Sequence, residues 1–191
     1  MGEKGVLLII PEREGVILRP ATDGDLPRVD EITIICYAPI VASFVEIVGE
    51  TFYEGIYGSP EADWQARKIK QVRDIYQAHP DQVWVLEESG EVSGFITFEI
   101  VPERQLGIFD NNGVLPEKRG QSWGTFMYRH VLRHFREQGI RFALIETDLD
   151  DPHIPARRAY EAVGFDRQQS IVIYRQDLDQ CNPGSELSQV S

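Results

Sequence analysis

The chain has 191 residues, of which 42% are hydrophobic and 26% charged, as is usual for a globular protein. This length predicts one domain with a sizeable core. The formal net charge of −12 argues against a general nucleic-acid-binding protein, because such a protein needs a basic face.

We expect neither a targeting signal nor a membrane span in this sequence. The apolar run at residues 6–10 is too short for either, and no other segment approaches the length of a span. The two cysteines, Cys36 and Cys181, lie far apart and form no metal-binding or redox motif, which fits a reducing compartment. We therefore expect a cytoplasmic protein that binds neither membrane nor nucleic acid.

Hydrophobic periodicity, capping residues and turn residues predict the elements in chain order. A strand at residues 15–19 is followed by a helix that begins at the cap cluster 22–25 and reaches Cys36. The apolar stretch 41–57 has no clear boundaries, and a second helix covers residues 60–79.

The second half of the chain alternates between strands and helices. We expect strands at 82–88, 92–101 and 106–114, a helix ending near 139, a strand at 140–147, a helix at 155–163 and a last strand at 171–174. This order indicates an α+β domain, a mixed sheet with helices on its faces. Its boundaries are an extension at 1–14, the domain at 15–178 and a tail at 179–191.

The turn at residues 114–125 is the most informative stretch of the chain. An apolar strand enters it, two glycines interrupt it, and an amphipathic helix leaves it. The first N–H groups of a helix have no internal partner and carry the positive end of the helix dipole, so such a turn favours a phosphate. The chain has no Gly-Lys-Ser/Thr of a Walker loop, and Gly120 and Gly124 have the wrong spacing for a dinucleotide fingerprint.

The pattern that remains is Arg119-x-x-Ser122-x-Gly124, preceded by Val114-x-Pro116. It resembles the pyrophosphate loop of the GNAT superfamily of N-acetyltransferases, whose pattern is Arg/Gln-x-x-Gly-x-Gly/Ala. Residues 17–26 resemble the first strand and helix cap of that family, and residues 156–165 are similar to its A-x-x-x-Y-E-x-x-G-F motif. The three motifs occur in family order and cover roughly residues 15–176.

The resemblance implies a GNAT-like fold with a mixed, mostly antiparallel sheet flanked by helices. It also implies acetyl-CoA as cosubstrate and a primary amine of a small molecule or peptide as acceptor. The N–H groups from Arg119 to Thr125 would hold the pyrophosphate, the N–H of Val114 would polarise the thioester carbonyl, and the neighbouring strand must splay away. The implied cofactor-binding residues are Val114, Leu115, Arg119, Gly120, Gln121, Ser122, Trp123, Gly124, Thr125, His153 and Tyr160.

Two residues depart from the family pattern. Ser122 replaces a glycine, and we expect binding to survive if the local φ is negative, because the hydroxyl can donate to a phosphate. His153 replaces an Asn seven residues before the Tyr, where its imidazole could bond to the pantetheine arm or to a carbonyl. Trp123 either contacts the cofactor or packs the helix onto the sheet.

Tyr160 is the candidate acid for the leaving thiolate. A phenol with a pKa near 10 can protonate a nearby thiolate with a pKa near 8.5. The alternative is a half-buried aromatic ring that anchors the last helix. No cysteine lies in the motifs, so direct transfer is expected rather than an acyl-enzyme.

Asp110 is the candidate general base. The family position for an acidic base aligns with Ile108, which cannot act as one. Strand alternation places Asp110 and Val114 on one face if the strand is regular; otherwise Asp110 and the following asparagines shape a bulge. Glu99 and Glu146 are the next candidates.

Three features have more than one interpretation. His130 and His134 have a zinc-compatible spacing, but a solvated helix face is favoured because no third ligand is evident. The aromatic residues Tyr37, Phe44, Phe52, Tyr53 and Tyr57 form either an acceptor site or plain core. The chain could also be a non-catalytic acyl-CoA-binding or regulatory module, and its last strand suggests a homodimer.

Overall fold

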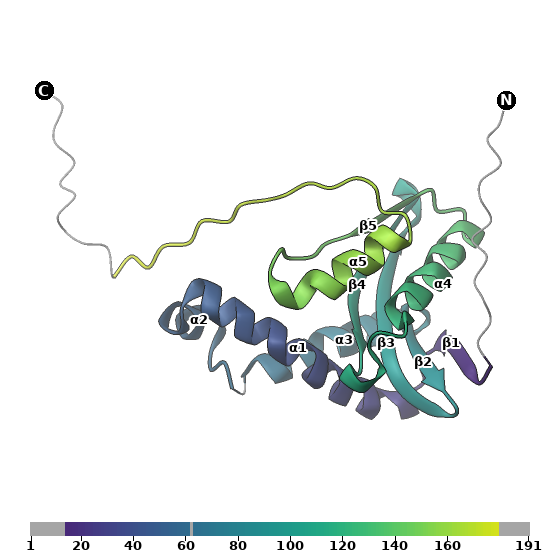
Figure 1. Cartoon of the computed structure of the whole chain (residues 1–191), viewed down its shortest axis with the longest axis horizontal. Coiled ribbons are helices and arrows are strands. Elements are labelled where there is room, and N and C mark those ends of the chain that lie inside the picture. The colour runs from purple at the N-terminus through teal and green to yellow at the C-terminus, as the bar shows by residue number, and fades with distance from the viewer. Residues whose placement is uncertain (1–13, 62, 180–191) are drawn as a thin grey trace, which may run out of the picture.

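The computed structural model describes residues 14–61 and 63–179, which form one five-stranded sheet with helices on both faces (Figure 1). Strands 1 to 4 pair antiparallel in chain order, and the fourth pairs parallel with the fifth. The strands are β1 (Val16–Pro20), β2 (Val83–Glu88), β3 (Glu91–Val101), β4 (Leu106–Val114) and β5 (Phe142–Ile145). The predicted α+β class and mostly antiparallel sheet are confirmed.

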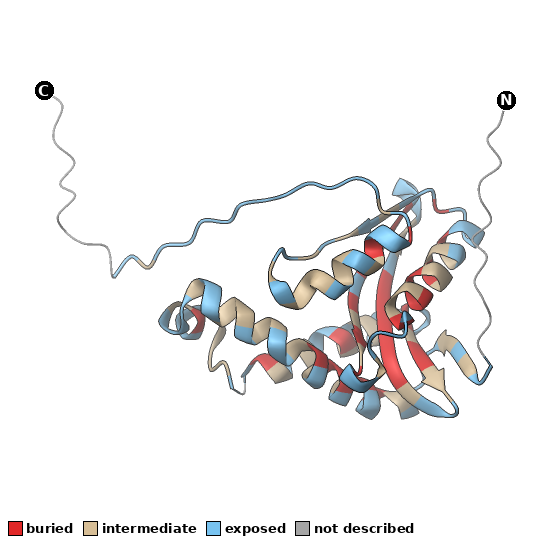
Figure 2. Cartoon of the chain, in the orientation of Figure 1, coloured by how far each residue is buried: buried red, intermediate tan, exposed pale blue. Residues whose placement is uncertain are grey.

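Helices on both faces of the sheet fill two cores, one on each face (Figure 2). On one face, Val29 and Ile32 of the first helix and Val72 of the third pack against Phe95 of β3. On the other face, Met127 and Val131 of the fourth helix pack against the strands. The helices are α1 (Leu26–Val48), α2 (Glu50–Tyr57), α3 (Asp63–Ala78), α4 (Trp123–Glu137) and α5 (Ile154–Ala162).

A bulge in β4 changes the face on which its side chains lie. Phe98 of β3 opposes Phe109, but Ile96, two residues away, opposes Asn112, so β4 carries one extra residue. Before the bulge Phe109 packs on Tyr128 of α4, whereas after it a Cβ at Gly113 would face Cys36 of α1. Asp110 and Val114 therefore do not share a face, and the condition of a regular strand is not met.

The parallel pair of β4 and β5 separates after four residues. Pairing runs from Leu106 opposite Phe142 to Phe109 opposite Ile145, where β5 ends. β4 continues to Val114, and no strand of residues 14–61 and 63–179 pairs with it on that side beyond Phe109. The strands therefore splay apart as the resemblance implied.

Two predictions for the elements are wrong, namely the end of the first helix and the last strand. α1 continues past Cys36 to Val48 with Pro39 inside it, so the unassigned stretch 41–57 is the end of α1 followed by α2. The last strand at 171–174 is absent, and these side chains are 64–92% exposed. β-Branched residues favour a strand only when a neighbouring strand pairs with them, and this segment has no partner within the described residues. The expected terminal extensions lie almost wholly outside the described residues, as does Cys181.

One segment, Asp23–Val48, is long and apolar enough to cross a membrane by length and composition. The expectation that no segment approaches that length is therefore wrong. One stripe of α1 packs onto the sheet through Val29, Ile32 and Cys36. A single such helix is weak evidence for a span, because the core helix of a globular domain meets the same criterion.

Gly107 of β4 permits the closest approach between the sheet and α4. A Cβ at this position would lie 2.3 Å from the ring of Phe135. We expect Gly107→Ala to lower the free energy of unfolding by about 1–3 kcal/mol, because the packed ring must move. The control is Gly55→Ala in α2, where no atom lies within 4 Å and the change should stabilise by about 0.5–1 kcal/mol. Urea denaturation tests both, and equal stability of the two variants would contradict the packing.

Candidate active site

A groove of about 520 Å³ runs between the open side of β4, the start of α4 and one side of α5. The first backbone hydrogen bond of α4 runs from the N–H of Phe126 to the carbonyl of Ser122 at 2.9 Å. The N–H groups just before Phe126 therefore precede the helical ladder, at the positive end of the dipole. The arrangement suits an anionic group at this end of the groove.

Most of the predicted cofactor-binding residues line this groove. They are Val114, Arg119, Gly120, Ser122, Trp123, Gly124, Thr125, His153 and Tyr160. Trp123 packs in the core, where it is 4% exposed against Phe126, and it also lines the groove, so that its contact with a cofactor stays a prediction.

Three expectations for the loop are corrected. Leu115 and Gln121 are not among the residues that line the groove. Leu115 is buried in the core on the α1 face, and its N–H donates to the carbonyl of Ser93 in β3 at 3.0 Å. The N–H of Arg119 donates to the carbonyl of Pro116 at 3.1 Å, so the row of N–H groups that faces an anion begins at Gly120.

Ser122 adopts a left-handed conformation, with φ 63° and ψ 25°. The condition of a negative φ, on which the sequence-based expectation for Ser122 depended, is therefore not met, and the glycine of the family pattern is the residue best suited to this backbone. Ser tolerates the left-handed region at a cost, because its Cβ crowds the backbone there.

The strain at Ser122 predicts opposite effects for two substitutions. Ser122→Val should lower the free energy of unfolding by about 1–3 kcal/mol, because a β-branched side chain is an outlier at this φ. Ser122→Gly should cause no such loss. Thermal denaturation measures both, and a Val variant as stable as the Gly variant would show that the loop does not hold this conformation.

Val114 directs its backbone into the groove. Its neighbour Leu115 donates to β3, and successive residues of a strand direct their N–H groups to opposite sides. The N–H of Val114 therefore points to the side that β5 has left open. A donor fixed in this way can polarise a carbonyl that lies in the groove.

Tyr160 lies on α5 with its side chain 7% exposed and its ring edge-on to Tyr128 at 5.1 Å. Burial raises the pKa of Tyr160 above 10, and the polar side chains of Tyr128, Thr147 and Asn112 nearby partly offset that rise. The phenol therefore stays protonated throughout the neutral range. Tyr160 therefore packs as an aromatic anchor of α5 and carries a protonated hydroxyl beside the groove.

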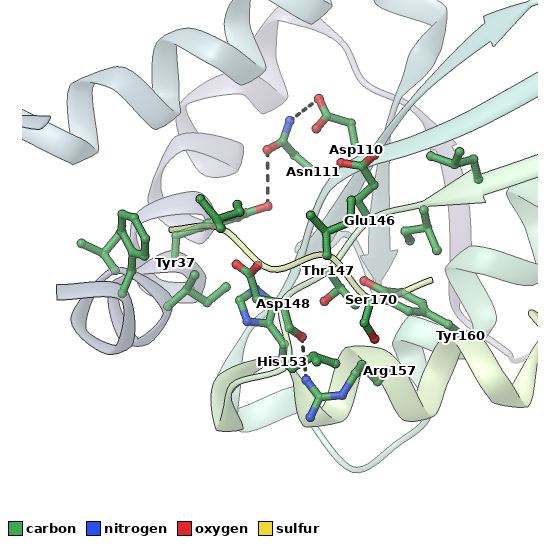
Figure 3. Close-up of a pocket in the computed structure, with 18 of the residues that line it drawn as sticks. Tyr37, Asp110, Asn111, Glu146, Thr147, Asp148, His153, Arg157, Tyr160 and Ser170 are labelled. Atoms are coloured by element: carbon green, nitrogen blue, oxygen red, sulfur yellow. Dashed lines mark hydrogen bonds between the residues drawn. The ribbon is translucent and has the colours of Figure 1, made fainter. Parts of the chain in front are cut away.

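A second cavity of about 1210 Å³ joins the groove and opens between α1, α2, α3 and the end of β5 (Figure 3). Four of the five aromatic residues considered above line it, namely Tyr37, Phe44, Tyr53 and Tyr57, whereas Phe52 does not. The residues that line both spaces are Tyr37, Ile40, Asp110, Glu146, Thr147, His153 and Tyr160. This set marks the junction at which two ligands would meet.

Asp110 lies at this junction, directly after Phe109 and on the opposite face of β4 from it. Its carboxylate accepts a hydrogen bond from Nδ2 of Asn111 at 2.8 Å. Burial raises the pKa of Asp110 above its usual value, the charge of Lys68 lowers it, and Glu99 raises it. The predicted bulge is confirmed, and it is compatible with a role as base. Glu146 also reaches the junction, whereas Glu99 lines neither space.

Lys68 and Tyr37 form a cation–π pair in the cavity wall that the sequence did not indicate. The Lys68 ammonium lies 4.2 Å from the centroid of the Tyr37 ring, and burial lowers the pKa of Lys68. The Tyr37 hydroxyl donates to Oδ1 of Asn111 at 3.4 Å. Lys68 belongs to a charged helix surface in sequence, and only the packing of α3 beside α1 and β4 brings it to the site.

His153 begins α5, where Asp150 holds its imidazole. Nδ1 of His153 contacts Oδ1 of Asp150, whose other oxygen accepts a hydrogen bond from the Ser43 hydroxyl at 2.6 Å. Burial raises the pKa of Asp150, but the hydrogen bonds from Ser43 and His153 outweigh it and leave the pKa below its usual value. No pattern in the sequence indicates this contact with α1.

His130 and His134 do not form the expected solvated face. Nδ1 of His130 lies 2.9 Å from the carbonyl of Phe126, and the His134 ring packs on Trp84 at 5.0 Å between centroids. Within residues 14–61 and 63–179, no three His, Cys, Asp or Glu side chains group as a metal site would need.

Residues 44–165 match the acetyltransferase (GNAT) family. A mycothiol acetyltransferase from Thermomonospora curvata is 26% identical over 163 residues, which cover 82% of this chain and 52% of that protein. A mycothiol acetyltransferase from Streptomyces coelicolor is 29% identical over 96 residues, 50% of this chain and 30% of that protein. The chain therefore spans about half the length of these curated relatives, or less.

Solved acetyltransferases share the fold. The aminoglycoside N-acetyltransferase AAC(6')-Iy, in complex with CoA, has a TM-score of 0.58 and 16% identity, with 88% of this chain and 99% of that chain covered. A GNAT family acetyltransferase from Brucella melitensis, in complex with acetyl-CoA, has a TM-score of 0.52 and 19% identity, with 81% and 85% covered. At these identities the likeness concerns the fold.

Proposed function

Because this chain belongs to the GNAT acetyltransferase family, we propose that it is an N-acetyltransferase that transfers an acetyl group directly from acetyl-CoA to a primary amine. The observation that carries this proposal is the opening beside β4. β5 ends at Ile145 while β4 continues to Val114, and the opening leads from the start of α4 to Tyr160.

The groove has the features that a CoA ester needs. Acetyl-CoA supplies an acyl group activated as a thioester, carried on a long arm that ends in a pyrophosphate. The N–H groups from Gly120 to Thr125 would bind the pyrophosphate, and Arg119, which lines the groove, would add positive charge. The arm would lie along the unpaired side of β4, with His153 beside it.

The reacting groups would meet at the junction of the two cavities. Val114 would donate its N–H to the carbonyl oxygen and stabilise the negative charge that develops there. Asp110 would hold the acceptor ammonium and take a proton from it, and Tyr160 would give its proton to the departing sulfur. Partial burial is consistent with these assignments, because the raised pKa makes Asp110 a stronger base than an ordinary Asp and keeps Tyr160 protonated until the thiolate forms.

The larger cavity is the proposed acceptor site. Its volume suits a small molecule, and aromatic rings and carboxylates line it. The names of the related proteins mention mycothiol and aminoglycosides, which supports a small-molecule amine for this chain. A peptide amine is the alternative acceptor, and a cytoplasmic location stays a prediction.

A homodimer is part of the proposal. Ile171, Val172, Ile173 and Tyr174 are 64–92% exposed, and β5 forms an edge of the sheet with Phe142 52% exposed. Pairing with a second copy would bury both features. Sedimentation equilibrium should give a dimer for the wild type and a monomer for Ile171→Glu/Ile173→Glu. A monomeric wild type would contradict the pairing.

An amine panel tests the activity. The purified protein, acetyl-CoA and one amine at a time (amino sugars, amino acids, polyamines, short peptides) are assayed for release of free thiol. We expect amine-dependent release with at least one class. CoA binding without turnover on any amine would point instead to an acyl-CoA-binding module.

A further inference from the structure

His153 occupies the place where the cofactor groove meets the acceptor cavity. It lines both spaces and precedes Tyr160 by seven residues, which places the two side chains on one face of α5 about 10 Å apart along the axis. Figure 3 shows His153 and Tyr160 on the same side of the pocket, across from Asp110. His153 therefore lies where the thioester and the acceptor amine would meet, and not at the end of the groove that would hold the pyrophosphate.

The contacts of Asp150 determine which nitrogen of His153 is free to accept a proton. An ionised carboxylate only accepts hydrogen bonds, and Asp150 already accepts one from Ser43. Its contact with Nδ1 therefore requires the hydrogen of the neutral imidazole to be on Nδ1. Nε2 then carries a lone pair on the side of the ring away from Asp150. An Asn at this position, as in the family pattern, could not take up a proton.

The proposed reaction needs a second proton acceptor. When an acceptor ammonium becomes an amide, one N–C bond forms, the C–S bond of the thioester breaks, and the nitrogen loses two protons. In the proposed reaction, Asp110 accepts the first of these two protons. Tyr160 gives its own proton to the sulfur, so one of the two nitrogen protons returns to Tyr160 through solvent and the other is released.

We propose that His153, oriented by Asp150, accepts the second proton that leaves the acceptor nitrogen. The inference rests on the proposed function. His153 is then a catalytic residue, because Nε2 contacts the acceptor, and Asp150 is a positioning residue. The other titratable or charged groups around this part of the pocket are Tyr37 from α1, Asp110 from β4, Glu146 and Asp148 from the end of β5 and the loop after it, and Arg157 and Tyr160 from α5.

The pH dependence of kcat/KM distinguishes proton acceptance from a structural role. At pH 8 the ratio of wild type to His153→Asn should be about 100, the usual size of a general-base effect. The ratio should shrink at lower pH, because an imidazole that already carries a proton on both nitrogens cannot accept another and the wild type then loses the same function. A ratio that does not change with pH would overturn the proposal.

Asp150→Asn tests the orientation, because its amide can donate to Nδ1 and force the hydrogen onto Nε2. At pH 8 we expect Asp150→Asn to lower kcat/KM by about the same factor as His153→Asn. CoA should still bind to the variant. The control is His130→Asn in α4, which lines neither cavity and should leave the pH profile unchanged. An Asp150→Asn variant with wild-type kcat/KM would contradict the positioning role.

The tautomer of His153 can be determined without any enzymatic reaction. Nitrogen-15 NMR of the imidazole of His153 in the free protein should show the hydrogen on Nδ1 in the wild type and on Nε2 in Asp150→Asn. A wild-type hydrogen on Nε2 would overturn the inference even if amines are acetylated. Failure of every amine in the panel would overturn the proposed function and this role together.

Discussion

Tyr160→Phe is expected to lower kcat about 100-fold or more with little change in the affinity for CoA. The ring keeps its contacts with Tyr128 and Phe165, so α5 stays in place. What is lost is the only part of the side chain that can protonate the sulfur. Because burial raises the pKa of Tyr160 above 10, the wild type should lose no activity to ionisation of this group between pH 6 and 9.

Tyr128→Phe is the matched control for this result. Tyr128 is buried against Tyr160, with its hydroxyl hydrogen-bonded to that of Tyr160. Its loss should reduce kcat only a few-fold, because the proton donor itself is retained. Steady-state kinetics and calorimetric titration with CoA measure both variants. If Tyr160→Phe keeps more than a third of wild-type kcat, Tyr160 is an anchor and not the acid.

Asp110→Asn is expected to lower kcat/KM about 100-fold without weakening CoA binding. An amide neither takes a proton nor attracts an ammonium. Because the pKa of Asp110 is raised, the carboxylate loses its proton at a higher pH than an ordinary Asp. The wild-type kcat/KM should therefore fall as the pH drops through that raised pKa. The pH profile of the variant should lack this acidic limb.

Glu99→Gln is the control for the charge around Asp110. Glu99 raises the pKa of Asp110 but lines neither cavity. Its replacement should move the limb of the pH profile slightly to lower pH and leave the maximal rate unchanged. An Asp110→Asn variant within threefold of the wild type would transfer the role of base to Glu146.

Local sequence patterns predicted the parts of the site that depend on local structure. The turn before α4 and the position of Tyr160 follow from glycines, helix periodicity and the spacing of one motif. Residues close together in the chain determine these features, so local sequence patterns are enough to predict them.

The sequence could not predict what depends on pairing or packing. The bulge at Asp110 appears only in the register with β3, and it reversed the expected relation between Asp110 and Val114. Residues 171–174 have strand propensity but no neighbouring strand to pair with in the described chain. The hydrogen bond from Ser43 to Asp150 joins residues that are 107 positions apart, and no local sequence pattern indicates it.

The φ of Ser122 is a different case, because the family pattern itself contained the signal. A glycine at that place of the motif indicates a backbone that L-residues avoid. The observed φ of 63° agrees with that reason, and the condition of a negative φ is not met.

Calorimetric titration of CoA into the wild type and into Gly120→Val tests the central claim most directly, namely that the groove beside β4 and the start of α4 bind the cosubstrate. Gly120 has a φ of 79° and open space around its Cα, so a valine would strain the loop and fill the place of the pyrophosphate. We predict one CoA per chain for the wild type and an affinity about tenfold or more lower for the variant, with both proteins folded by circular dichroism. A wild type that does not bind CoA, or a folded variant that binds it equally well, would contradict the account.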